Sequence, residues 1–386
     1  MNQTERDLLY LVESVIKNNE CVIPKNMDEL FVCAERQKIL PFLFECLSGR
    51  INKELQQELN RVTYKNIAQF WHLFTLTRQI TKALLDHEIP VAVLKGISTA
   101  NYYPVMEYRK SGDIDLLIRN SDSKKAEKIL NEHCFTRNEK QDAIHHISYT
   151  GNSGIEIEMH ILFVEPFDNT KANHLLKYYS EEALSHVHLI RIEGVSFPIL
   201  DETFQALSII LHMLQDYLRA GFGLKLLIDW SLFWNNWENP AEKDAFFQIA
   251  SEFGIMGFVD TVTSTCSEIG FLEQSYNPIA SLEPDIHKML LQDIFEAGEF
   301  GKGDNTRMVA LRGHGLGAYF REFHHQMCLN HPNSSHILLL WPVLWVETLA
   351  GFIKNNNKIR KIKTFDIILK ASKRMVLTNK MKLFRK

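Results

Sequence analysis

The periodicity of apolar residues divides the chain into three parts. In residues 1–87 apolar side chains recur at helical spacing, and the stretch 52–87 is long, amphipathic and free of glycine and proline. In residues 88–200 short β-branched runs alternate with turn residues, which is typical of strands. The helical period returns in residues 201–386. The sequence therefore predicts an α+β fold, in which a small mixed β-sheet is flanked by N-terminal and C-terminal helical regions.

Turn residues mark the limits of the strands in the central part. Residues 151–154 form a hairpin turn, and a second hairpin turns at Glu193 and Gly194. Asp201 follows and is suited to cap a helix that runs to about Leu218. The segments predicted to form strands are residues 91–96, 113–119, 144–150, 154–163 and 188–200.

The second of these strands carries two carboxylates. Side chains alternate between the faces of a strand, so Asp113 and Asp115 point to the same side while Ile114 faces the core. Two neighbouring carboxylates repel each other unless a cation lies between them, and Mg²⁺ prefers such oxygen ligands together with substrate phosphates. We therefore expect a metal site here. Replacing either Asp with Asn should abolish turnover without loss of thermal stability, because the repulsion is relieved.

The preceding strand ends in a turn that is suited to phosphate. Gly96 lets the backbone approach a phosphate group closely. Lys95 and Arg109 add positive charge on either side of this turn, and Ser98 adds a hydroxyl. These residues are predicted to bind nucleotide, with a surface charge or an ion pair as the simpler interpretation of Lys95 and Arg109.

A glycine after one strand, followed by Asp-x-Asp on the next, resembles the DNA polymerase β-like nucleotidyltransferase superfamily. More narrowly, the motifs LKG, YP and GDIDLLI are similar to those of a mostly uncharacterised branch of stand-alone bacterial nucleotidyltransferases, over roughly residues 89–230. The resemblance implies a catalytic core in residues 88–200. It also implies transfer of a nucleoside monophosphate from an NTP to an acceptor hydroxyl or phosphate, with Mg²⁺ or Mn²⁺ and release of pyrophosphate.

The resemblance also implies a third carboxylate, which precedes a histidine on a later strand. Glu158 and His160 match this unit, and Glu156 lies on the same strand face as an alternative ligand. Downstream, a histidine-bearing helix and a Lys-Leu-Leu-x-Asp helix resemble further segments of the branch. They place three more residues in recognisable positions of the branch: His212, Lys225 and Asp229. His212 and Asp229 are predicted to contact the nucleotide or the acceptor, with a buried hydrogen-bonded pair as the simpler interpretation.

The sequence gives no support for a zinc site. His145 and His146 with His160 would supply three imidazoles, but adjacent residues of a strand point to opposite faces. The six cysteines are widely spread and lack CxxC spacing, so we expect neither a cysteine zinc site nor a disulfide framework.

The distribution of charge bears on the acceptor. A formal net charge of −4 argues against a protein that coats nucleic acid and favours a small molecule or a glycan precursor. Residues 354–386 are basic, with Asp366 as their only acid, and would suit an anionic partner. Nucleotidylation of a protein or RNA is therefore one alternative, and a non-catalytic binding or scaffold module of the same fold is another.

The sequence predicts a cytoplasmic protein without an integral membrane segment. The N-terminus lacks the basic start and apolar run of a secretory signal. The apolar stretch 337–353 is interrupted by Pro342, Glu347 and Gly351, and is short for a membrane span. We expect it to form a buried helix or helix pair, with an interfacial membrane contact as the alternative.

Overall fold

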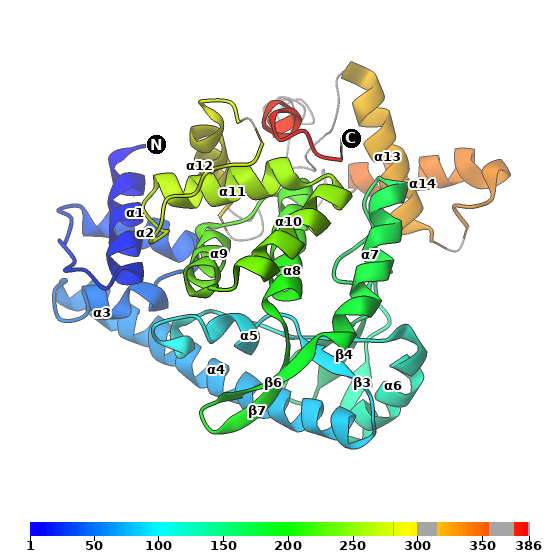
Figure 1. Ribbon diagram of the computed structural model, residues 1–386, viewed down its shortest axis with the longest axis horizontal. Helices are drawn as coiled ribbons and strands as arrows, with labels where there is room; N and C mark the ends of the chain where they lie inside the picture. Colours follow the sequence, from blue (N-terminus) through cyan, green and yellow to red (C-terminus); the bar gives the residue numbers. More distant parts are fainter. Residues whose placement is uncertain (281, 299–314, 333, 355–373, 385–386) are drawn as a thin grey trace.

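The computed structural model describes residues 1–386 except positions 281, 299–314, 333, 355–373 and 385–386. The architecture is mixed α+β (Figure 1): a seven-stranded sheet carries helices on both faces, and the first helices of the chain pack beside those that follow the sheet. The predicted fold class is therefore confirmed.

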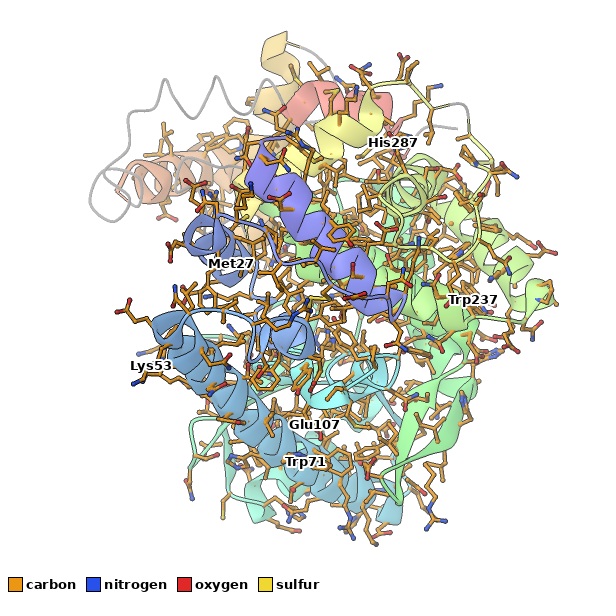
Figure 2. The ribbon with its side chains drawn as sticks, turned by 90° about the vertical axis from the view of Figure 1, so that its left-hand side faces the viewer. Met27, Lys53, Trp71, Glu107, Trp237 and His287 are labelled. Carbon is orange, nitrogen blue, oxygen red and sulfur yellow. A yellow bond between two sulfur atoms is a disulfide. The ribbon has the colours of Figure 1, made fainter. Side chains whose placement is uncertain are left out.

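The N-terminal helices begin at asparagine caps. Asn2 and Asn52 each accept a hydrogen bond from a backbone N–H three residues further on, at 2.8 and 2.9 Å. The last helix of the region is continuous over 34 residues, as predicted for residues 52–87. It runs along one side of the molecule, where Figure 2 labels Lys53 and Trp71. The helices are α1 (Gln3–Ile16), α2 (Met27–Arg36), α3 (Phe44–Leu47) and α4 (Lys53–Asp86).

The sheet has the strand order β3-β4-β5-β2-β1-β7-β6. Two of its pairings are parallel, β1 with β7 and β2 with β5, and the remaining pairings are antiparallel. Strand β3 was not predicted, because it is only three residues long and two of them are exposed. The strands are β1 (Val91–Val93), β2 (Ile114–Ile118), β3 (Phe135–Arg137), β4 (His146–Gly151), β5 (Glu156–His160), β6 (Val187–Ile192) and β7 (Val195–Leu200).

Strand register brings the end of β1 and the carboxylates of β2 and β5 together at the centre of the sheet. Because β1 and β2 are antiparallel, the residues after β1 lie beside the first residues of β2, and Leu94 N donates to Asp115 O at 3.1 Å. Because β2 and β5 are parallel, Asp115 is paired directly with Glu158. The turn and the carboxylates predicted from the sequence therefore meet at one place.

The two faces of the sheet pack against different helices. Ile114, Leu116 and Ile118 of β2 face α4 and α6, in a core that includes Leu73 and Ile129. Leu117, on the opposite face, joins a larger core that contains the helices after the sheet. Figure 1 shows α4 crossing on one side of the sheet and α8 to α12 gathered on the other. The carboxylate face of β2 is therefore covered by the C-terminal helices.

The second predicted hairpin and the helix after it are confirmed. Glu193 and Gly194 both have positive φ, at 48° and 76°, between β6 and β7. Asp201 caps α8 by accepting from Phe204 N at 2.9 Å. The helices after α4 are α5 (Ile97–Ala100), α6 (Ser123–Glu132), α7 (Thr170–Glu182), α8 (Glu202–Arg219), α9 (Leu224–Asn236), α10 (Pro240–Phe253), α11 (Met256–Glu268), α12 (Ile286–Ala297), α13 (Gly315–Asn330) and α14 (Trp341–Lys354).

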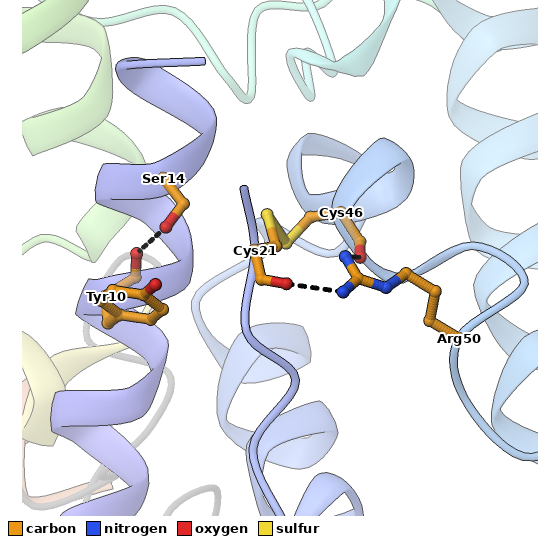
Figure 3. The surroundings of a disulfide bond; sticks show 5 residues. All are labelled: Tyr10, Ser14, Cys21, Cys46 and Arg50. Carbon is orange, nitrogen blue, oxygen red and sulfur yellow. Dashed lines mark hydrogen bonds between the residues drawn. A yellow bond between two sulfur atoms is a disulfide. The ribbon is translucent and has the colours of Figure 1, made fainter. Parts of the chain in front are cut away.

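A disulfide joins Cys21 to Cys46, although no disulfide framework was expected (Figure 3). The disulfide links the segment after α1 to α3. Arg50 also stabilises this segment, because it donates a hydrogen bond to Cys21 O at 2.7 Å. The two cysteines are 25 residues apart, a spacing that carries no motif. Only the packing of the folded chain brings their Cα atoms to 5.7 Å, so the sequence pattern could not reveal the pair.

The expectation that residues 337–353 are buried is wrong. Leu338, Leu339 and Val346 have exposed fractions of 67, 91 and 65%. Within the described residues α14 packs against α13 through aromatic contacts, such as Trp345 with Phe320 at 5.4 Å between ring centroids. One side of the helix is thus covered, while Val343, Val346 and Leu349 remain at the surface. Among the helices that the structure describes, none is long and apolar enough to cross a membrane.

The basic C-terminal tail is described only in part. Residues 355–373, which hold most of its predicted amphipathic helix, lie outside the described residues. Arg374, further along the tail, is buried and pairs with Asp293 at 3.1 Å. This cation therefore stabilises the fold internally, and the predicted contact with an anionic partner stays a prediction for the rest of the tail.

Candidate active site

A sharp turn follows β1 and leads into α5. Gly96 occupies it with φ 64° and ψ −109°, a conformation that side chains with a Cβ rarely adopt. A pocket beside this turn is lined by Lys95, Gly96, Ser111 and the two aspartates of the DxD motif, with apolar residues of α4. The turn and the two aspartates therefore line the same small pocket.

The side chain of Asp115 is the centre of a polar group. Its Oδ1 lies 3.5 Å from Lys95 Nζ and 3.0 Å from His160 Nε2. His160 Nε2 is also 3.3 Å from Glu158 Oε2, so the imidazole lies between two carboxylates. Only 3% of the Asp115 side chain is exposed, which strengthens each of these interactions.

These contacts shift the pKa values of the group. Burial alone would raise the pKa of Asp115, but Lys95 and the hydrogen bond from His160 outweigh burial and hold the pKa well below its usual value. Burial would lower the pKa of His160, yet its hydrogen bonds to Asp115 and Glu158 raise it to about 9. The group is therefore fully charged near neutral pH, with cations already placed between the carboxylates.

Asp113 is the residue immediately before β2, and its pKa is shifted in the opposite direction. The negative charge of Asp115 is the main cause that raises the pKa of Asp113, to about 6, and burial adds to the effect. Lys95 opposes this shift without cancelling it. The repulsion between the two carboxylates therefore mainly affects the pKa of Asp113. A cation near Asp113, in addition to Lys95, would relieve that repulsion.

The two glutamates of β5 have different surroundings. Asp115, Glu158 and His160 each offer a ligand atom, and these atoms lie within 4.8 Å of one another, so that they could hold a metal ion. Glu156 is paired across the ladder with Thr150, and its carboxylate accepts from Gln141 Nε2 at 2.8 Å. Glu158 is therefore the better placed of the two alternatives.

Two residues predicted to bind nucleotide, Arg109 and Asp229, form an ion pair with each other. Arg109 donates to both carboxylate oxygens of Asp229, at 2.9 and 2.8 Å, and both side chains are buried. Tyr103 donates to Asp229 Oδ1 at 2.6 Å, and Arg109 Nη1 donates to Ser111 Oγ at 2.7 Å. Lys225 of α9 donates to the next backbone carbonyl of this loop, at 3.3 Å. These bonds fix the loop that leads into Asp113 against α9, which is a positioning role.

Ser98 and His212 lie beneath the carboxylate face. Ser98 is buried, donates to Lys95 O at 3.3 Å and accepts from Gln205 Nε2 of α8 at 3.4 Å. His212 of α8 is also buried, 5.8 Å from His160 between ring centroids, and its Nε2 has no hydrogen-bond partner among the described residues. Burial lowers the pKa of His212 well below its usual value, so the ring is neutral.

Sequence reasoning missed residues that the structure adds to this group. Asp216 lies one helical turn after His212, and burial raises its pKa to about 6 while the nearby Lys95 opposes the shift. The i,i+4 spacing from His212 is the signal that could have identified it. His145 and His146, expected on opposite faces, lie together with His160, because His145 precedes β4 and is not bound by the alternation of the strand.

The surroundings of Asp113 predict a pH effect on stability. Its folded-state pKa of about 6 is above the ordinary value of about 3.9, so the stability that its protonation provides is complete below about pH 4. That stability is lost as pH rises through about 6. We therefore expect the Tm of the wild type, measured in EDTA by differential scanning fluorimetry, to decrease as the pH rises from 5 to 7. The Tm of Asp113→Asn should not show this decrease. Glu132→Gln, an exposed acid on α6, is the control; parallel Tm profiles for wild type and Asp113→Asn would contradict the assignment.

The comparison with known families agrees with this geometry. A mixed sheet gathers carboxylates beside a glycine turn, as the resemblance to nucleotidyltransferases implied. A family model described as an uncharacterised nucleotidyltransferase matches residues 24–270. The match covers more than half of the chain, so the protein belongs to this nucleotidyltransferase family and is a transferase. A search of curated proteins finds no match.

Proposed function

We propose that the protein is a metal-dependent nucleotidyltransferase that moves a nucleoside monophosphate from an NTP to an acceptor hydroxyl or phosphate, with release of pyrophosphate. The observation that carries the proposal is the direct pairing of Asp115 with Glu158 beside the glycine turn at Gly96. The near-neutral charge of the chain favours a small molecule or a glycan precursor as the acceptor.

Each residue of the group has a role that fits its position. Asp113, Asp115 and Glu158 would hold Mg²⁺ or Mn²⁺, hard ions that prefer carboxylate oxygens. Such an ion would neutralise the charge that develops on the transferring phosphate. Lys95 lies 3.5 Å from Asp115 and adds positive charge on the side where the triphosphate would approach. Gly96 leaves room for a phosphate against the backbone, since no Cβ projects there.

The products of NTP cleavage test the reaction class. With Mg²⁺, a fractionated metabolite extract and NTP labelled at the α-phosphate, the label should move to an acceptor while pyrophosphate is released. Release of inorganic phosphate instead, with a labelled NDP, would contradict nucleotidyl transfer. The reaction without extract is the control for simple hydrolysis.

Replacing the two glutamates of β5 separately tests the third ligand. Glu158→Gln should lower kcat by about 100-fold or more, because a metal ligand and the partner of His160 are lost together. Glu156→Gln removes a carboxylate that is bound to Gln141, so kcat should stay within about twofold of wild type. Steady-state kinetics across Mg²⁺ concentrations makes the comparison. The reverse order of the two effects would assign the third ligand to Glu156.

A further inference from the structure

Three histidines form a compact group beside the carboxylates. His146 of β4 is paired with His160 of β5, and His145 lies just before β4, where its carbonyl accepts from Ile161 N at 2.8 Å. The ring centroids lie 4.4 Å apart for His145 and His146, and 5.6 and 5.4 Å from His160. All three side chains are buried. A cluster of imidazoles in the interior calls for a physical explanation beyond core packing, since histidine is costly to bury without partners.

The nitrogen atoms of this group are spaced like the ligands of one ion. His145 Nε2 lies 3.0 Å from His146 Nδ1, which lies 3.5 Å from Glu158 Oε2. That oxygen is 3.3 Å from His160 Nε2. An ion with bonds of about 2.1 Å holds neighbouring tetrahedral ligands about 3.4 Å apart. These three donor distances are therefore close to the edge length of such a tetrahedron, and the three histidines by themselves place one ligand atom each within 4.8 Å of the others.

In two of the rings, the nitrogen that does not face Glu158 donates a hydrogen bond to a backbone carbonyl, as in many metal-binding histidines. His146 Nε2 donates to Gln141 O at 3.2 Å, and His160 Nδ1 donates to Leu162 O at 3.3 Å. A backbone carbonyl can only accept, so these nitrogens carry hydrogen, which leaves His146 Nδ1 and His160 Nε2 beside Glu158 Oε2 to bind an ion. The ion would displace the proton that His160 Nε2 donates to Asp115 and Glu158. His145 Nδ1 is buried and has no hydrogen-bond partner among the described residues, so hydrogen bonding satisfies only the Nε2 side of this ring.

We propose that His145, His146, His160 and Glu158 bind one divalent transition-metal ion of the Zn²⁺ class. Imidazole nitrogens suit zinc and related ions, whereas Mg²⁺ prefers oxygen ligands. The site shares Glu158 with the proposed nucleotidyl-transfer site but does not depend on that function, because most of its ligands are histidines. An ion at this place would fix the orientation of Glu158 and leave Asp113 and Asp115 to a Mg²⁺-bound nucleotide.

Zinc binding by the full-length, EDTA-treated protein tests the proposal. Isothermal titration calorimetry with Zn²⁺ alone, together with metal analysis after gel filtration, should give one tightly bound ion per chain. His145→Gln and His146→Gln should each weaken binding at least about 10-fold, while His188→Gln, an exposed histidine of β6, should not. Co²⁺ should give the visible absorption of a tetrahedral site in wild type, and this signal should be lost in His146→Gln.

Failure of this proposal can be told apart from failure of the proposed function. Asp113→Asn lacks none of the four zinc ligands, so it should keep Zn²⁺ binding while it loses binding of Mg²⁺-NTP. Wild type that binds no Zn²⁺ at micromolar concentration would overturn the metal site, whether or not it binds nucleotide. Zn²⁺ affinity that is unchanged in both histidine variants would also overturn it, because the ion would then be bound elsewhere. Circular dichroism verifies that each variant is folded.

Discussion

Replacing Asp115 with Asn is expected to abolish nucleotidyl transfer, with kcat lowered about 1000-fold or more. Asp115 is the one carboxylate that contacts Lys95 and His160 and is paired with Glu158. Losing a carboxylate that would hold the metal ion removes several kcal/mol of transition-state stabilisation, and each 1.36 kcal/mol is about a tenfold loss of rate. Pyrophosphate release under saturating NTP and Mg²⁺ measures the effect. Activity within about tenfold of wild type would show that Asp115 is not a metal ligand.

The same substitution should also destabilise the fold, which differs from the expectation drawn from the sequence. The aspartate pair was predicted to be equally strained, but the pKa of Asp115 is lowered and that of Asp113 is raised. Asp115→Asn weakens charge-assisted bonds to His160 and Lys95, so the free energy of unfolding should fall by about 2 kcal/mol. Asp113→Asn should keep or raise stability in urea denaturation at pH 7. Equal effects of the two substitutions would contradict the asymmetry.

Replacing Asp229 with Ala should lower the free energy of unfolding by about 3–5 kcal/mol. Arg109 would be left as a buried, unpaired cation, since its two bonds to Asp229 are lost and its side chain is only 4% exposed. Urea denaturation followed by circular dichroism measures the change. The double variant Arg109→Met/Asp229→Leu should recover most of the loss, because no buried charge remains.

An exposed ion pair provides the matched control for this prediction. Asp86 pairs with Lys82 on the surface of α4, and Asp86→Ala should change stability by less than about 1 kcal/mol. A loss below about 1 kcal/mol in Asp229→Ala would mean that the pair is not buried in solution. If Arg109→Met/Asp229→Leu has normal stability but binds NTP more weakly than wild type, the result would support the prediction that these two residues contact nucleotide.

Sequence reasoning could predict those features that depend on local pattern. Alternation along a strand placed Asp113 and Asp115 on one side, and turn residues predicted the hairpin at Glu193 and Gly194. The long helix after Asn52 followed from an unbroken amphipathic stretch. These features depend on residues that are close together in the sequence, so the local sequence is sufficient to predict them.

Features that depend on pairing between distant segments could not be predicted in this way. The choice between Glu156 and Glu158 needs the register of β5 against β2, which periodicity does not give. The bidentate bond between Arg109 and Asp229 joins residues that are 120 positions apart. His145 escaped prediction because the alternation rule was applied beyond the end of β4. Tertiary packing decides each of these cases.

Calorimetric titration of ATP, GTP, CTP and UTP, with and without Mg²⁺ or Mn²⁺, into wild type and Asp115→Asn tests the central claim most directly. The account predicts that at least one NTP binds wild type only when the metal is present, and that this binding disappears in Asp115→Asn. Metal-independent binding, equal binding to the variant, or no binding of any NTP to wild type would contradict the proposed site.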